Sequence, residues 1–125
     1  MSLKIYSVEN SNIPENEIVR LKTSRKINLK GYALVDRTFS DGIKISNEFR
    51  HIFIFPDLEV NPAEFVRLYT GKGKYKKEKH YKDNHIIHFL YWNSEQCVWN
   101  DKGGDTATLI TYNAVDSKAV PAVEK

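Results

Sequence analysis

Short runs of β-branched and aromatic residues, each closed by a turn signal, limit this chain to a narrow range of folds. His51–Phe55 ends at Pro56-Asp57, and Ile86–Tyr91 has the same character. Asn61-Pro62-Ala63-Glu64 has the marks of a helix start, but Gly71 follows too soon for a stable helix. Since Phe65–Thr70 is rich in β-forming residues, we predict a turn feeding a strand there. Seven or more short strands and no convincing long helix predict an all-β fold, an antiparallel β-sandwich.

The length of 125 residues fits a single domain, and 41% hydrophobic with 28% charged residues fits a globular one. We expect residues 1–16 to be a tail or an edge strand, 17–117 to be the sandwich, and 118–125 to be a C-terminal tail. No apolar run approaches the ~18 residues of a membrane-spanning helix. The N-terminus lacks the apolar core of a signal peptide, and the compartment is left open.

The remaining strands are predicted from alternation and turn residues. In the strand from Glu17 to Thr23, Ile18, Arg20 and Lys22 alternate with Val19, Leu21 and Thr23. Further strands are expected at Ile27–Val35, at Cys97–Asn100 and at Asp105–Tyr112, where Ala107 and Leu109 share one face. Turns are expected at Ser40-Asp41-Gly42 and at Asp101–Gly104.

The whole positive excess of the chain lies in one segment. The formal net charge is +3, and the window 71–83, GKGKYKKEKHYKD, has six lysines against one glutamate and one aspartate. We favour a solvated loop or an edge strand protected from aggregation by lysines. The alternative is a nucleic-acid or other anion contact, in which aromatic rings stack on bases. Its candidate residues are Lys72, Lys74, Lys76, Lys77, Lys79, Lys82, Tyr75 and Tyr81.

The stretch LYWNSEQCVWNDKGGDTATLI, which begins at Leu90, carries a specific resemblance. A tryptophan, a short loop, Val-Trp-Asn, a Gly-Asp turn and an alternating strand follow one another. The matching residues are Trp92, Val98, Trp99, Asn100, Gly104, Asp105, Ala107 and Leu109. This pattern resembles the closing motif of the lamin tail domain, an immunoglobulin-like module, and looser similarity extends from about Glu17 to Ser117.

The resemblance implies an immunoglobulin-like sandwich in which Trp92, Trp99, Asn100, Gly104 and Asp105 have structural roles. Two indoles are large apolar bodies suited to a small core without a disulfide. Tail domains of this family are implicated in contacts with proteins and with DNA. We therefore expect a non-catalytic binding or structural module with a protein partner, and alternatively a DNA-binding module that uses Lys72–Lys82.

Catalytic, metal and cofactor chemistry is not expected. His85 and His88 are three residues apart, so on a strand they face opposite sides, whereas zinc needs its ligands together. The single cysteine, Cys97, excludes an intrachain disulfide and is expected to be a small buried hydrophobic residue rather than a nucleophile. Gly71-Lys72-Gly73 is too short for a phosphate-binding loop.

Overall fold

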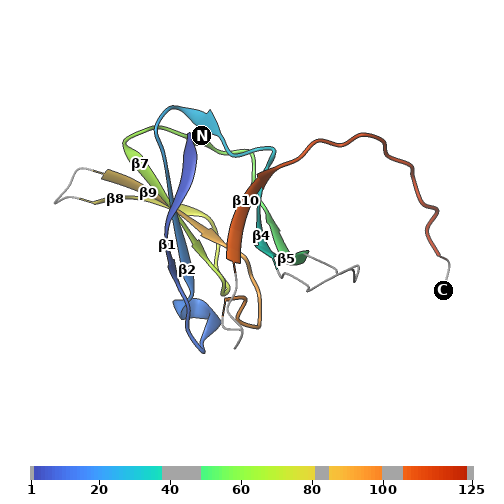
Figure 1. Cartoon of the computed structure of the whole chain (residues 1–125), viewed down its shortest axis with the longest axis horizontal. Coiled ribbons are helices and arrows are strands. Elements are labelled where there is room, and N and C mark those ends of the chain that lie inside the picture. The colour runs from blue at the N-terminus through green and yellow to red at the C-terminus, as the bar shows by residue number, and fades with distance from the viewer. Residues whose placement is uncertain (1, 38–48, 81–84, 100–105, 124–125) are drawn as a thin grey trace, which may run out of the picture.

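The computed structural model describes residues 2–37, 49–80, 85–99 and 106–123. They form an all-β sandwich, which confirms the predicted fold class. One layer is a five-stranded sheet with the order β1-β2-β7-β9-β8, and the other is a three-stranded sheet with the order β10-β4-β5. A two-stranded ribbon, β3-β6, is separate from both. Figure 1 shows the two layers side by side.

The strands are short, and most of them overlap a predicted run, although the predicted strand Ile27–Val35 is divided between two strands. The five-stranded sheet contains β1 (Leu3–Glu9), β2 (Ile18–Thr23), β7 (Glu64–Tyr69), β8 (Lys76–His80) and β9 (His85–Tyr91). The three-stranded sheet contains β4 (Tyr32–Arg37), β5 (Phe49–Ile54) and β10 (Thr106–Thr111), and the ribbon contains β3 (Ile27–Asn28) and β6 (Glu59–Val60). A 3-10 turn, η1 (Pro14–Asn16), joins β1 to β2. Among the described residues no helix is long and apolar enough to cross a membrane.

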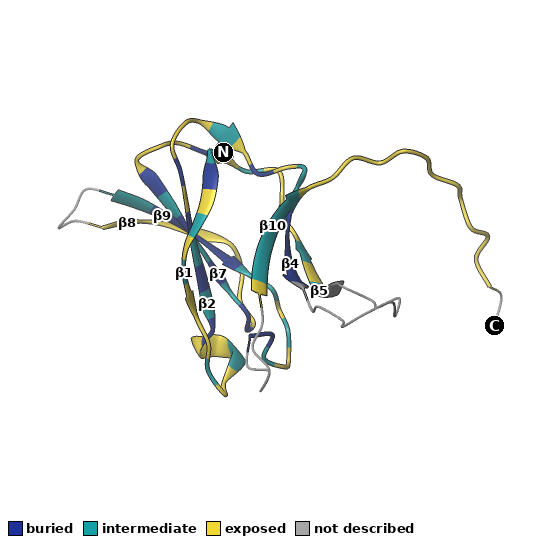
Figure 2. Ribbon diagram, viewed as in Figure 1, coloured by how far each residue is buried: buried dark blue, intermediate teal, exposed yellow. Residues whose placement is uncertain are grey.

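The core lies between the two layers and follows the period of two that a half-buried strand requires. In β2, which its alternation predicted as a strand, Val19 and Leu21 are fully buried. Leu34 of β4 faces them in the same core cluster, and Leu109 of β10 packs against it. Figure 2 shows buried residues on strands of both sheets and an exposed extension after β10.

Two features of the topology differ from the prediction. The sandwich is not wholly antiparallel, because β7 and β9 pair in parallel while every other pairing within the described sheets is antiparallel. Cys97–Trp99 is not a strand either. The backbone N–H groups of Val98 and Trp99 both donate to the carboxylate of Glu17, so they take no part in a strand ladder.

The two ends of the chain behave differently. Leu3–Glu9, predicted as a tail or an edge strand, pairs with β2 and forms one edge of the large sheet. Residues 112–123 are exposed and have no regular structure. The predicted turn at Ser40-Asp41-Gly42 and the glycine turn at Asp101–Gly104 lie outside the described residues.

Candidate ligand-binding face of the five-stranded sheet

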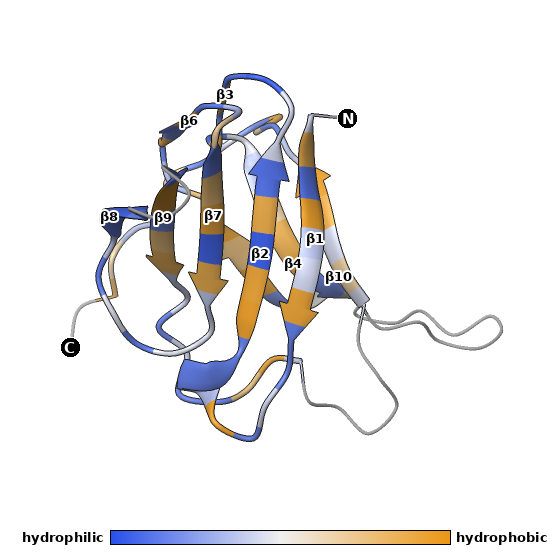
Figure 3. Ribbon diagram, turned by 90° about the vertical axis from the view of Figure 1, so that its left-hand side faces the viewer, coloured by the Kyte–Doolittle hydropathy of each residue, from blue (hydrophilic) through white to orange (hydrophobic). Residues whose placement is uncertain are grey.

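The side of the five-stranded sheet that turns away from the core carries an unusual set of side chains. Figure 3 looks onto this side, with β4 and β10 behind it. Strand register and alternation place the set on one surface, which we call the outer face. It comprises Lys4, Tyr6, Glu9, Ile18, Arg20, Lys22, Phe65, Arg67, Tyr69, Lys76, Glu78, His80, His85, Ile87, Phe89 and Tyr91.

The aromatic side chains of the outer face form two rows across the strands. In the first row, the ring centroid of Phe65 lies 6.0 Å from that of Tyr6 and 5.0 Å from that of His85. In the second row, Tyr69 and Tyr91 are opposite each other in the register and stack at 5.4 Å. Tyr69 lies four positions after Phe65 in β7, so the rows are about 13 Å apart at ~3.3 Å per residue.

Cationic side chains lie between and over these rings. Lys22 Nζ is 5.3 Å from the ring centroid of Tyr6. The Arg67 guanidinium carbon is 5.7 Å from the ring centroid of Phe89, and Lys76 Nζ is 4.7 Å from it. This coverage leaves the Phe89 ring buried although it faces away from the core. Cations held over aromatic faces are attracted by the ring quadrupole, which fixes their position while their charge stays available.

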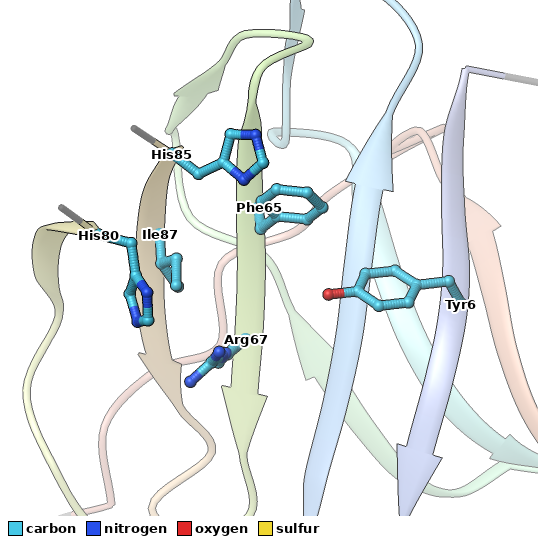
Figure 4. A pocket seen from close by; sticks show the side chains of 6 residues that line it. All are labelled: Tyr6, Phe65, Arg67, His80, His85 and Ile87. Carbon is cyan, nitrogen blue, oxygen red and sulfur yellow. The ribbon is translucent and has the colours of Figure 1, made fainter. Parts of the chain in front are cut away.

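The first aromatic row borders a shallow pocket of about 190 Å³. Its lining residues are Tyr6, Phe65, Arg67, His80, His85 and Ile87. Figure 4 shows that His80 and His85 come from the neighbouring strands β8 and β9, with Arg67 below Phe65 on β7. The pocket therefore combines an aromatic wall, a guanidinium and two imidazoles, a donor-rich lining that suits an anionic or aromatic ligand.

A second polar cluster lies on the core side of the same sheet. His88 Nε2 is 2.9 Å from Glu64 Oε1, and the Tyr75 hydroxyl is 2.9 Å from His88 Nδ1. A neutral His88 fits both contacts when Nε2–H donates to the carboxylate and Nδ1 accepts from the tyrosine. Asn61 N–H also donates to Glu64 Oε1, at the turn that feeds β7. Within this cluster His88 is 2% and Glu64 7% exposed, whereas Tyr75 is 49% exposed.

The pKa values of Glu64 and Tyr75 are shifted in this cluster. Burial alone would raise the pKa of Glu64, but the hydrogen bonds from Asn61 and His88 hold the pKa below its usual value. Burial, and then the nearby charge of Glu64, raise the pKa of Tyr75. The ionised acid and the neutral phenol are thus the favoured forms, which suits a structural hydrogen-bond chain.

The structure does not place the candidate residues of the lysine segment on one surface. Lys76–His80 form the edge strand β8, all of it exposed, in agreement with the favoured interpretation. Within β8, Lys76 lies on the outer face, whereas Lys77 and Lys79 alternate to the opposite side. Of the other candidates, Lys72 pairs with Glu95 and Tyr75 binds His88, while Lys74 is exposed. Tyr81 and Lys82 lie outside the described residues.

Of the two indoles that we predicted as core residues, Trp99 is buried and Trp92 is partly buried against the core. Trp99 is 5% exposed within the core cluster, and Trp92 packs against it edge to face at 6.0 Å. The fully buried carboxylate of Glu17 fixes the backbone of the Trp99 segment. The other motif residues, Asn100, Gly104 and Asp105, lie outside the described residues.

The cysteine and the histidines do not assemble into a reactive centre within the described residues. Burial raises the pKa of the Cys97 thiol, and Glu17 and Glu15 raise the pKa further. His85 faces outward and His88 inward, as their spacing predicts, and His51 Nδ1 contacts Asp36 Oδ2 on the other sheet at 3.0 Å. In the described ranges, no three metal-ligating side chains come together.

In comparisons with known proteins, no protein-family model, no curated protein and no solved structure matches this chain.

Sequence reasoning missed the outer face because it placed the candidate contact in one continuous segment. The residues of the outer face come from five strands, and the register that aligns them is not visible in a linear pattern. One feature of the sequence could have indicated the outer face. In Phe65–Tyr69 the solvent-side positions are Phe65, Arg67 and Tyr69, whereas a solvated sheet face normally has polar residues there.

Proposed function

We propose that this chain is a non-catalytic binding module whose contact surface is the outer face and whose partner is a polyanion. The observation that carries the proposal is the pair of cations, Lys22 and Arg67, held over aromatic rings near the middle of the sheet. Among the described residues neither has a carboxylate partner, in contrast to Arg20 with Glu9 and Lys76 with Glu78. Within the described part of the chain, these two cations therefore have no carboxylate that competes with an anionic ligand.

The charge balance of the outer face supports a polyanionic partner. Within the described residues the face has five cationic side chains against two carboxylates, before any contribution from His80 and His85. A sheet face with a net positive charge raises the local concentration of an anionic partner and speeds its association. Phosphate, sulfate and carboxylate polymers all meet this condition.

A non-catalytic role fits the environments of the reactive side chains. His88 and Glu64 are buried beneath the sheet, and the raised pKa of Cys97 keeps that thiol protonated at neutral pH. The resemblance to the lamin tail domain points the same way, because it implies a contact module.

The test is salt-dependent binding to a panel of polyanions: a heparin oligosaccharide, duplex DNA, single-stranded DNA and polyphosphate. We expect at least one to bind, and its affinity to fall steeply between about 50 mM and 200 mM salt. The double variant Lys22→Glu/Arg67→Glu should abolish binding. The matched double variant Lys30→Glu/Lys118→Glu, which makes the same charge change elsewhere, should bind much better. Equal behaviour of the two variants, or no binding to any polyanion, refutes the proposal.

The same assay separates the outer face from the lysine segment. DNA bound through Lys72–Lys82 would lose affinity in Lys77→Glu/Lys79→Glu, whose side chains point away from the outer face. Under our proposal, this variant loses less affinity than Lys22→Glu/Arg67→Glu.

A protein partner is the second candidate, favoured by the open edge of the large sheet. Within the described residues β8 pairs only with β9, and all five of its residues are exposed. An extended peptide could add a strand there through backbone hydrogen bonds. The test variant, Lys79→Pro, removes a backbone N–H donor from β8. The control variant, Lys74→Pro, makes the same substitution before the strand begins. A protein partner captured equally by both variants does not use this edge.

A further inference from the structure

The structure points to single-stranded nucleic acid as the ligand of the outer face, an inference that rests on the proposed function and specifies its ligand. The strand would cross the sheet with one base against the Phe65 ring, in the pocket between Tyr6 and His85, and with phosphates at Lys22 and Arg67. A later base would meet the second aromatic row at Tyr69, since the Tyr91 ring lies between Tyr69 and Gly73.

The first step of the argument is that the face offers rings as well as charge. A polyanion without rings, such as heparin or an acidic peptide, needs only the cations. The outer face instead has two aromatic rows with a cationic band between them. Proteins that bind single strands combine these same two elements, aromatic platforms for bases and a positive track for the backbone.

The second step concerns access to the bases. A duplex buries the faces of its bases in its own stack and presents phosphates outward, so the rings of the sheet would have nothing to stack on. An unpaired strand can turn its bases onto Phe65 and Tyr69. On a sheet surface, aromatic side chains are a known platform for such unstacked bases.

The third step concerns the size and the lining of the pocket. Its volume of about 190 Å³ matches one planar heterocycle better than an extended polymer. Tyr6 is 41% exposed, so its ring and hydroxyl can meet a base that enters from solvent. Arg67 closes the pocket on the side of the second row, where the phosphate that links two bases would lie.

The experiment compares two oligomers with the same phosphates. Fluorescence anisotropy at low salt measures binding of an oligothymidylate of about twelve nucleotides, within the range of known single-strand sites, and of an abasic oligomer of equal length. We expect the oligothymidylate to bind at least ten-fold more tightly than the abasic oligomer, and more tightly than the duplex or heparin.

A matched pair of variants tests the ring directly. Phe65→Leu keeps the apolar bulk but removes the π-face, and should weaken oligothymidylate binding at least five-fold, with little effect on the abasic oligomer. Phe53→Leu makes the same change on β5, in the other sheet, and should leave binding unchanged. Thermal unfolding of both variants confirms that they are folded.

The outcomes are distinguishable. Equal binding of the oligothymidylate and the abasic oligomer, or tighter binding of heparin or of a polyglutamate peptide, overturns the single-strand inference and leaves the polyanion module standing. No effect of Phe65→Leu on oligothymidylate binding also overturns it. Absence of binding to every polyanion overturns both the inference and the proposed function.

Discussion

The carboxylate of Glu17 accepts hydrogen bonds from the backbone N–H groups of the segment that places Trp99 in the core. Its Oε2 lies 3.1 Å from Trp99 N, and its Oε1 lies 2.8 Å from Val98 N. More than eighty residues separate the partners, and Glu17 is fully buried. One carboxylate thus joins the start of β2 to the irregular segment that follows β9. Charge-assisted hydrogen bonds of this kind are stronger than neutral ones.

Glu17→Ala should be strongly destabilising, because it leaves two buried N–H groups without an acceptor. We expect a loss of about 2–4 kcal/mol in the free energy of unfolding, measured by urea denaturation. Glu17→Gln keeps one acceptor oxygen and should lose less. Glu95→Ala removes an exposed carboxylate and should stay within about 0.5 kcal/mol of the wild type. A Glu17→Ala protein as stable as the Glu95→Ala protein would show that the contact contributes little.

Glu64 should make stability depend on acid pH. Its pKa is lowered in the folded protein, so its contribution is complete above the unfolded pKa near 4.5 and is lost as pH falls through the lower folded pKa. Glu64→Gln should therefore be less stable at pH 7, by about 1–3 kcal/mol, and should lose less stability below pH ~4.5 than the wild type does. Denaturation curves at several pH values measure this, with Glu59→Gln as the exposed control. Parallel wild-type and Glu64→Gln profiles would contradict it.

Gly71 should not tolerate a side chain. A Cβ at this position would lie 2.8 Å from Glu15 Cα and 2.9 Å from Glu15 N, and the backbone of η1 cannot move as easily as a side chain. We expect Gly71→Ala to cost about 1–3 kcal/mol of stability, as overpacking does. Lys74→Ala, an exposed change in the same connection, should be nearly neutral. The midpoint of thermal unfolding checks both, and equal midpoints would refute the close approach.

The strand pattern of β2 could be predicted from the sequence, whereas the partners of Glu17 and Glu64 could not. Alternation in Ile18–Thr23 predicted a strand whose two faces differ, because the period of a strand depends only on its own sequence. The face with Val19 and Leu21 is the buried one. The partners of Glu17 and Glu64 carry no local signal, since a buried carboxylate is recognised only by the distant groups that satisfy it. The pairing of β7 with β9 was missed for the same reason. Short apolar runs indicate a strand but do not specify its neighbour or direction.

For the candidate site, too, the local sequence showed where charge is concentrated but not which side chains share a surface. Charge density directed attention to Lys72–Lys82, yet alternation sends Lys77 and Lys79 away from Lys76, and Lys72 is paired with Glu95. Among the described residues, the cations that lie over rings without a carboxylate partner come from β2 and β7 instead, because Lys76 is paired with Glu78. A local count of lysines records how much charge a segment has, whereas a binding face depends on which strands lie beside one another.

Arg67 should set part of the salt dependence of ligand binding. If its guanidinium neutralises one phosphate of a single strand, Arg67→Gln lowers the magnitude of the slope of log K against log salt by about 0.7. Lys22→Gln should act alike, and the two effects should add if each cation meets a separate phosphate. Lys30→Gln removes a charge outside the outer face and should leave the slope unchanged. Titrations of the oligothymidylate at four salt concentrations give these slopes. A slope that falls equally in Lys30→Gln and Arg67→Gln would mean that only the net charge of the protein matters, and that the outer face is not where the phosphates bind.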